Sequence, residues 1–162
     1  MLIDIGNTNT SMAVSGEKGI EKRFFLRTAR DQLEAGSLRR LFRPYIKKVE
    51  GIVIVSVVPG FLSTLKKSLA AVFPGAGISL IGRDIEVPIR NRYRAPSQVG
   101  QDRLVTAFSA LKALGAPVIV VDFGTAVTFD VVNARGEYEG GLIFPGIRLA
   151  LGSLSSKAAL LP

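Results

Sequence analysis

The chain has 162 residues, a net charge of +8, and neither cysteine nor histidine. The missing cysteine excludes disulfides and thiolate chemistry. The missing histidine removes the commonest general base and zinc ligand, so a proton acceptor has to be a carboxylate or, less often, Lys or Tyr. The positive charge fits a nucleic-acid partner, steering of anionic small molecules, or a solvated basic surface.

The basic residues are not interleaved with aromatic residues as they are in stacking platforms for single strands, so no nucleic-acid partner is expected. The sequence has no signal-peptide pattern and no run of roughly 20 apolar residues. We therefore expect a cytoplasmic protein that does not bind a membrane.

Hydrophobic periodicity predicts alternating strands and helices over the first 115 residues. The predicted strands cover residues 2–5, 10–15, 20–28, 52–58 and 78–81. The predicted helices cover residues 31–45, 62–73 and 98–114, with Asp31 as the N-cap of the first helix. The arginine-rich stretch 87–96 is interrupted by prolines and is expected to be a loop or an edge.

The pattern restarts after Gly115-Ala116. Strands are predicted over residues 117–122, 126–132 and 136–144, and a terminal helix over residues 145–161. This order indicates two domains, a complete N-terminal lobe at residues 1–115 and a partial second copy at residues 116–162.

A sequence repeat supports this division. "LIDIGNTNTSMAV" aligns with "VVDFGTAVTFDVV" at a constant offset of 118 residues. The offset matches Asp4 with Asp122, Gly6 with Gly124, Asn7 with Thr125 and Thr10 with Thr128. Each half alone is a weak signal, because an Asp-x-Gly at a strand end is found in many turns, but a matched pair in two lobes is informative.

The residue types in the repeat suit a phosphate ligand. Glycine lets backbone N–H groups approach an anion closely, and Thr and Asn side chains add donors. An aspartate at a strand end can hold a hydrated Mg²⁺, which prefers one or two carboxylates plus waters and phosphate oxygens. Two such hairpins facing each other would clamp a polyphosphate, although no Walker motif is present.

A third carboxylate lies between the two copies, in the sequence "VGQDR" at residues 99–103. Asp102 lies near the start of a predicted helix, and Arg103 beside it is suited to pair with a substrate carboxylate. The alternative is that Asp102 only stabilises the first helical turn, where the macrodipole favours a negative charge. Composition alone favours this alternative.

Taken together, "DIGNTNT", "VGQDR", "VVDFGTAVTFD" and "GGLIFPG" resemble the type III pantothenate kinases in order and spacing, from Met1 to Pro162. The "YRAP" and "VGQDR" stretches separate this family from other members of the acetate-kinase, sugar-kinase, Hsp70 and actin superfold. The resemblance implies an α/β fold of two RNase-H-like lobes with nucleotide between them. It also implies phosphorylation of pantothenate by ATP, the first step of coenzyme A biosynthesis.

The resemblance implies roles for particular residues. Asp102 would be the general base, and the residues that bind pantothenate would be Tyr93, Gly100, Gln101, Asp102 and Arg103. The residues that bind ATP and its phosphates would be Asp4, Ile5, Gly6, Asn7, Thr8, Asn9, Thr10, Ser11, Gly124 and Thr125. Asp122 would bind a monovalent cation, K⁺ or NH₄⁺, and Asp4 would contact Mg²⁺ through water.

The chain departs from the family pattern in two ways. Val127 stands where the family has a polar residue, and the family's chains usually extend further, to complete the second lobe. A three-stranded second sheet would leave an apolar face uncovered, unless a partner buries it. The family's helix after Pro145 contributes to a dimer interface, so a homodimer is implied.

Two alternatives remain open at this point. The short second lobe fits a non-catalytic or regulatory kinase-like fragment. The three carboxylates and the positive charge fit an RNase-H-like nuclease, but two-metal nucleases need carboxylates converging on ions roughly 3.5–4 Å apart. Asp4 and Asp122, each followed by its own phosphate-binding hairpin, suit a nucleotide clamp better.

Overall fold

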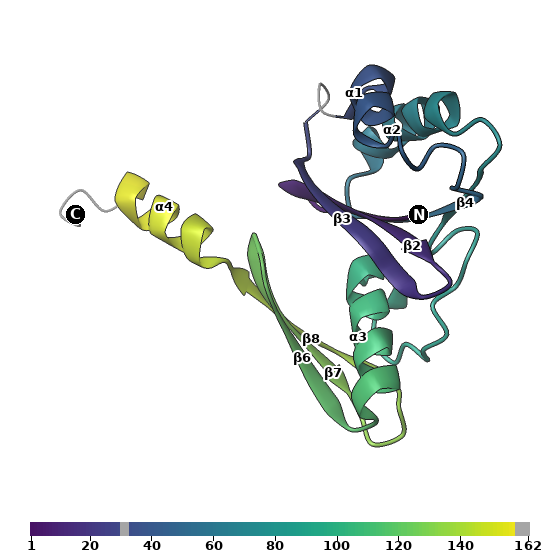
Figure 1. Ribbon diagram of the computed structural model, residues 1–162. Helices are drawn as coiled ribbons and strands as arrows, with labels where there is room; N and C mark the ends of the chain where they lie inside the picture. Colours follow the sequence, from purple (N-terminus) through teal and green to yellow (C-terminus); the bar gives the residue numbers. More distant parts are fainter. Residues whose placement is uncertain (30–32, 158–162) are drawn as a thin grey trace. The chain divides into compact units, whose positions relative to one another are not determined.

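The computed structural model describes residues 1–29 and 33–157, which fall into two compact units, the first ending at Glu86 and the second beginning at Val87. Figure 1 shows the elements in chain order. The elements of the first unit are β1 (Leu2–Ile5), β2 (Asn9–Gly16), β3 (Gly19–Arg27), α1 (Ala35–Leu41), β4 (Gly51–Ser56), α2 (Pro59–Val72) and β5 (Gly77–Leu80).

The first unit is built on a mixed five-stranded sheet in the order β3-β2-β1-β4-β5. The pairs β3-β2 and β2-β1 are antiparallel, whereas β1-β4 and β4-β5 are parallel. Helices α1 and α2 lie over one face of this sheet (Figure 1). Ile3 and Ile5 point into the core beneath the helices, so Leu2 and Asp4 face the other side, as alternation along a strand requires.

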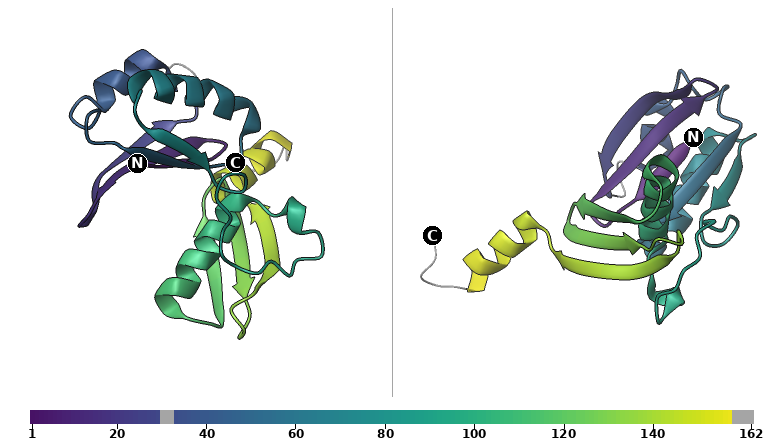
Figure 2. Two further views of the ribbon diagram at one scale, coloured as in Figure 1. Left: turned by 90° about the vertical axis from the view of Figure 1, so that its right-hand side faces the viewer. Right: turned by 90° about the horizontal axis from the view of Figure 1, so that it is seen from below.

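The second unit has a smaller sheet. Its elements are a short 3₁₀ turn η2 (Pro96–Gln98), α3 (Gln101–Leu114), β6 (Val118–Phe123), β7 (Ala126–Val132), β8 (Tyr138–Pro145) and α4 (Ile147–Lys157). The three strands are antiparallel in the order β6-β7-β8. Helix α3 packs on one face of this sheet, with Leu104 and Ala107 buried against Val132 and Tyr138. Helix α4 continues from β8 and extends away from the sheet (Figure 2).

Most predicted elements are confirmed to within a few residues, and the segment at 87–96 contains no strand. The first helix was predicted wrongly, because α1 covers only Ala35–Leu41 and the chain then runs through turns to Lys48. Pro44 explains the early end, since proline lacks a backbone N–H and disfavours a helical residue before it. The predicted N-cap Asp31 and the end of the last predicted helix lie outside the described residues.

The boundary predicted at residues 115/116 concerns the two lobes as repeats, and it stays a prediction. In the structure α3 packs within the second unit, so the compact units divide earlier, between Glu86 and Val87. Each unit contains three consecutive antiparallel strands, β1-β2-β3 within the five-stranded sheet and β6-β7-β8 in the smaller sheet, and the middle strand of each three is paired with both others. Among the helices that the structure describes, none combines the length and apolar character needed to cross a membrane.

Candidate active site

The loop between β1 and β2 carries the first predicted phosphate-binding residues. Asn7, Thr8 and Asn9 are exposed at its tip, and Gly6 donates its backbone N–H to the Asn9 carbonyl at 3.0 Å. A Cβ on Gly6 would lie 3.1 Å from that carbonyl oxygen, so the tight turn favours glycine. Asp4 is exposed on the sheet face opposite the core, in register with Ser11 on β2.

Two of the predicted phosphate ligands have buried side chains instead. Ile5 is fully buried in the core, and Thr10 is fully buried with its hydroxyl 3.0 Å from the hydroxyl of Thr28. The Thr28 hydroxyl is also 2.8 Å from the Gly6 carbonyl oxygen, to which it donates. Ile5 therefore offers a ligand only backbone atoms, and the Thr10 hydroxyl contacts Thr28, which in turn supports the loop.

Thr28 is a functional candidate that the sequence reasoning missed. It lies just past the end of β3, where its backbone N–H donates to the Thr8 carbonyl at 2.9 Å while its hydroxyl fastens Gly6. One residue thus holds both sides of the loop. The available signal in the sequence was a polar residue directly after the third strand. The sequence pattern alone does not reveal that Thr28 contacts Gly6 and Thr8, which lie far from it along the chain.

The loop between β6 and β7 is held in a similar way in the second unit, but it is one residue shorter than the β1-β2 loop. Gly124 donates its N–H to the Ala126 carbonyl at 2.9 Å, and Gly146, just past β8, donates its N–H to the Thr125 carbonyl at 2.9 Å. Gly146 stands 118 positions after Thr28, the offset of the sequence repeat. A Cβ on Gly146 would collide with the carbonyl oxygens of Gly124 and Thr125, so the close approach requires glycine.

Asp122 precedes this second loop. Asp122 is exposed near the end of β6 and pairs in register with Thr128 on β7. Among residues 1–29 and 33–157 no three carboxylates gather into a ready-made metal centre.

The second unit contains a cavity of about 220 Å³ between the start of α3 and β8. Its lining residues are Tyr93, Gln98, Val99, Arg103, Tyr138, Gly140, Gly141 and Ile143. Two of the predicted pantothenate-binding residues, Tyr93 and Arg103, line it directly. Gly100, Gln101 and Asp102 lie alongside in sequence, with Gly100 as the N-cap of α3 and the other two in its first turn.

Two adjacent glycines of β8 let side chains reach the cavity. Gly140 has φ +116°, and a Cβ there would lie 2.6 Å from the ring of Tyr93. A Cβ on Gly141 would overlap the Phe129 carbonyl and lie 2.9 Å from Nη2 of Arg103. The "GG" of the sequence motif "GGLIFPG" is therefore the wall against which Tyr93 and Arg103 pack.

Arg103 is anchored by a buried carboxylate. Its Nε donates to Oδ1 of Asp130 at 2.8 Å, and its Nη2 lies 2.7 Å from the same oxygen. Tyr138 donates its hydroxyl to that oxygen as well, at 2.6 Å. Burial, followed by the hydrogen bond to Asp130, raises the pKa of Tyr138 above its ordinary value, so the phenol stays protonated and keeps donating.

Asp102 has an unusual environment. Its Oδ1 is buried, yet no hydrogen-bond partner for it exists in the part of the chain that the structure describes. A buried polar atom without a partner costs about 1–3 kcal/mol, and native structures contain only a few such atoms. The charge of Asp102 is the smallest of the causes that raise the pKa of Tyr138.

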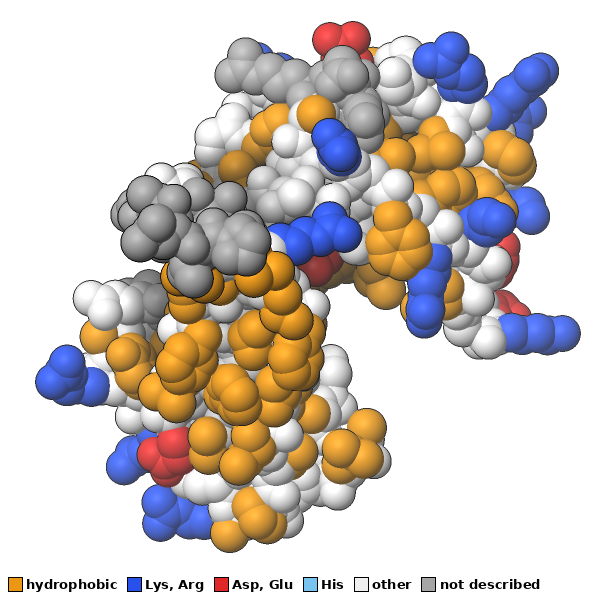
Figure 3. Space-filling view, turned by 90° about the vertical axis from the view of Figure 1, so that its left-hand side faces the viewer, with side chains coloured by type: hydrophobic (Ala, Val, Ile, Leu, Met, Phe, Trp, Pro, Cys, Tyr) orange, Lys and Arg blue, Asp and Glu red, His pale blue; other side chains and the backbone are white. Residues whose placement is uncertain are grey.

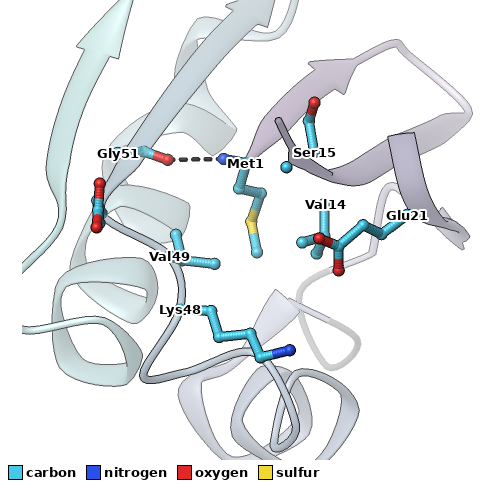
Figure 4. A pocket seen from close by; sticks show the side chains of 9 residues that line it. Met1, Val14, Ser15, Glu21, Lys48, Val49 and Gly51 are labelled. Carbon is cyan, nitrogen blue, oxygen red and sulfur yellow. Dashed lines mark hydrogen bonds between the residues drawn. The ribbon is translucent and has the colours of Figure 1, made fainter. Parts of the chain in front are cut away.

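A second cavity, of about 240 Å³, lies in the first unit and contains none of the predicted site residues (Figure 4). The Met1 ammonium group donates to the Gly51 carbonyl at 2.7 Å beside it, and burial lowers the pKa of that ammonium. This cavity is at the start of β1, roughly 13 Å along the strand from the Gly6 turn. It is therefore not the predicted phosphate site.

Comparison with solved structures first defines the class of fold. The crystal structure of the Aquifex aeolicus member of the Ppx/GppA protein family aligns with 96% of this chain and 53% of its own, with a TM-score of 0.51 and 13% identity. At that identity the likeness concerns the fold alone. It places the chain among α/β proteins with mixed sheets of this type.

Sequence comparison then identifies the family. The type III pantothenate kinase model matches residues 1–162, and the chain belongs to that family. The type III pantothenate kinase of Sulfurihydrogenibium sp. is 37% identical over 170 residues, covering 100% of this chain and 66% of that protein. The one from Persephonella marina is 48% identical over 116 residues, covering 72% and 45%. The chain thus spans less than two thirds of the length of these relatives.

Proposed function

We propose that the complete protein transfers the γ-phosphoryl group of ATP to pantothenate, the first step of coenzyme A biosynthesis. The observation that carries this proposal is the unpartnered, buried Oδ1 of Asp102, next in sequence to an arginine that lines a cavity. Membership in the type III pantothenate kinase family names the substrate class. An oxygen without a partner needs a donor, and a substrate hydroxyl supplies one.

Arg103 is the group that we assign to the pantothenate carboxylate. Its Nε and Nη2 are occupied by Asp130 and the Phe129 carbonyl, whereas Nη1 makes no hydrogen bond with any described residue. Arg103 lines the cavity, and the two N–H donors of its Nη1 thus remain for an anionic ligand. Tyr93 forms part of the wall, and Gly100 and Gln101 lead the chain into α3.

The reaction needs positioning and charge neutralisation more than covalent help. The pantothenate hydroxyl oxygen attacks the γ-phosphorus while the bond from that phosphorus to the β,γ-bridging oxygen breaks. ADP leaves with the bond's electron pair, and the hydroxyl proton passes to the Asp102 carboxylate. Because proton transfer can come late in a loose transition state, the proton acceptor need not be a strong base.

We assign nucleotide binding to the two hairpin loops. The proposed phosphate ligands are the backbone and exposed side chains of Asp4, Ile5, Gly6, Asn7, Thr8, Asn9, Thr10, Ser11, Gly124 and Thr125. Asp4 would hold hydrated Mg²⁺, and Asp122 a monovalent cation, K⁺ or NH₄⁺. The donors fit, because both are exposed carboxylates at strand ends beside turns rich in backbone N–H groups. Mg²⁺ would neutralise charge on the transferred phosphate.

We also propose that the protein works in the cytoplasm as a homodimer, and that its lobes are two copies of one RNase-H-like unit. The matched support of the two loops, by Thr28 and by Gly146, favours a common origin. The apolar outer face of the β6-β7-β8 sheet favours a protein partner.

The test is to incubate the complete protein with ATP, Mg²⁺, K⁺ and pantothenate, and to follow ADP and phosphorylated pantothenate together. One ADP for each phosphorylated pantothenate is expected, with little turnover when pantothenate is omitted. ATP consumption that does not depend on pantothenate would contradict the proposal.

A further inference from the structure

We propose that Asp130 is a positioning residue that selects for the substrate's carboxylate by holding Arg103 in one orientation. The inference rests on the proposed function, because it concerns how the same cavity recognises pantothenate. It goes beyond the site residues expected from the sequence, which include neither Asp130 nor Tyr138.

The first argument is the geometry around one oxygen atom. Oδ1 of Asp130 accepts from Nε of Arg103 at 2.8 Å and from the Tyr138 hydroxyl at 2.6 Å, and it lies 2.7 Å from Nη2 of Arg103. The side chain of Asp130 is only 2% exposed, and that of Arg103 is 15% exposed. Three donors therefore converge on one buried acceptor.

The second argument concerns the flexibility of arginine. A free arginine side chain samples many rotamers, and ordering it on binding costs affinity. Here the Nε edge of Arg103 is fixed before any ligand arrives, by Asp130 and by the Phe129 carbonyl at 3.1 Å from Nη2. Gly141 lets the guanidinium lie directly against β8. The Nη1 group thus remains available in a defined place beside the cavity.

The charge of Asp130 considered alone predicts that removing Asp130 tightens pantothenate binding, whereas a positioning role predicts weaker binding. The direction of the change in binding therefore tests the inference. Asp130 compensates the positive charge of Arg103, so its removal would leave a stronger electrostatic attraction for an anion. If Asp130 only shielded Arg103, its loss would tighten pantothenate binding. If Asp130 positions Arg103, its loss weakens binding, because the freed guanidinium then has to be ordered when pantothenate binds.

The experiment compares two substrates in the full-length protein. One is pantothenate, and the other is its neutral analogue, in which a hydroxymethyl group replaces the carboxylate. The measured quantity is the preference, the ratio of kcat/KM for pantothenate to kcat/KM for the analogue. We expect Asp130→Ala to lower this preference about 10- to 100-fold, mainly through the KM for pantothenate, with the KM for ATP unchanged.

Two further variants separate positioning from general damage. Asp130→Asn keeps an acceptor oxygen of the same shape without the charge, so it should fold and recover part of the preference. Arg103→Gln gives the lowest preference to be expected, because it removes the group that recognises the carboxylate. Adding Asp130→Ala to Arg103→Gln should cause little further loss of preference, since both changes act through one interaction.

Glu137→Gln is the matched control. Glu137 is also a carboxylate paired with arginines, at 3.2 Å from Arg90 and 3.1 Å from Arg135, but it does not line the cavity. Its preference should equal that of the unmodified protein. A Glu137→Gln loss equal to that of Asp130→Ala would overturn the inference.

Failure of the inference differs from failure of the proposed function. An active enzyme in which Asp130→Ala and Asp130→Asn retain or increase the preference, while Arg103→Gln abolishes it, would overturn the positioning role alone. A protein that phosphorylates neither compound would overturn both proposals. If Asp130→Ala does not fold, Asp130→Asn decides by the direction in which the preference changes.

Discussion

Asp102 and Arg103 are neighbours in the chain, but their surroundings differ. Successive helical residues are about 100° apart around the axis, so the first turn of α3 presents the two side chains in different directions. Arg103 meets Asp130 and the Phe129 carbonyl, whereas Oδ1 of Asp102 meets no partner in the described chain. The pair thus combines a fixed cation with an acceptor that still needs a donor.

Gly140 allows the first prediction at the residue scale. Gly140→Ala should lower the free energy of unfolding by about 2–4 kcal/mol, since alanine is strained at φ +116° and its Cβ would lie 2.6 Å from the Tyr93 ring. Because Tyr93 lines the cavity, the KM for pantothenate should rise too. Denaturant unfolding and steady-state kinetics measure the two effects.

Gly136→Ala is the control for backbone strain alone. Gly136 has φ +76°, but a Cβ there would lie 3.6 Å from Leu111, an ordinary contact. We expect it to cost about 1–2 kcal/mol in unfolding free energy and to leave the KM unchanged. If Gly136→Ala and Gly140→Ala lowered the unfolding free energy equally and raised the KM for pantothenate equally, the Gly140–Tyr93 contact would have no specific role.

At the scale of elements, the two loops owe their shape to residues outside them. Thr28 fastens the β1-β2 loop through two of its atoms, and Gly146 fastens the β6-β7 loop through its N–H. Both residues follow the third strand of their unit. The shape of each loop therefore depends on all three antiparallel strands around it and not on the loop sequence alone.

Thr28→Val tests this support. The change keeps the branched shape but removes the hydroxyl, which leaves the buried Thr10 hydroxyl without its partner. We expect a loss of about 1–3 kcal/mol in unfolding free energy and a higher KM for ATP. Thermal unfolding and nucleotide titration are the measurements.

Thr28→Ser keeps the hydroxyl, so its unfolding free energy and its KM for ATP should both be close to those of the unmodified protein. Ser15→Ala removes an exposed hydroxyl, bonded to the Gly19 carbonyl at 3.2 Å, from the far end of the same hairpin. It should change neither property. A KM for ATP that is unaffected by Thr28→Val would exclude this loop from nucleotide binding.

Element positions could largely be predicted from the sequence, because strands such as 2–5 and 126–132 carry their own apolar pattern. The start of α2 was missed by three residues, since Pro59 was interpreted as a break although proline is favoured in the first helical turn. The motif around Asp102 was visible as well. Its support was not, because Arg103 and Asp130 are 27 residues apart and nothing in a local pattern reveals such a pair.

At the scale of the whole molecule, one surface stands out. The β6-β7-β8 sheet carries α3 on one face, and residues that alternate along the strands place apolar side chains on the other. Figure 3 shows hydrophobic side chains gathered there. The exposed residues of this outer face are Ile119, Val121, Phe123, Leu142 and Phe144.

The outer face predicts self-association of the 162-residue chain. An apolar face of this kind favours association, and a charge placed on it would oppose burial. Sedimentation should therefore show a mass that rises with concentration, and Leu142→Glu should reduce the rise. Leu142 is 59% exposed on this face and belongs to the edge strand β8.

Ile20→Glu provides the comparison, because Ile20 is an apolar residue of β3, 48% exposed, in the other unit. It should leave association unchanged. A chain that stays monomeric at all concentrations, or one that Ile20→Glu disrupts as strongly, would argue against this face as the contact.

We propose that Asp102 accepts a proton during phosphoryl transfer to pantothenate. The most direct test of this proposal is single-turnover formation of phosphorylated pantothenate by the full-length protein and by its Asp102→Asn variant, with pantothenate binding measured by calorimetry. We predict a rate lower by about 10²- to 10⁴-fold with binding changed little, and no such loss for Asp84→Asn, an exposed carboxylate of the first unit. Normal turnover by Asp102→Asn would contradict the account.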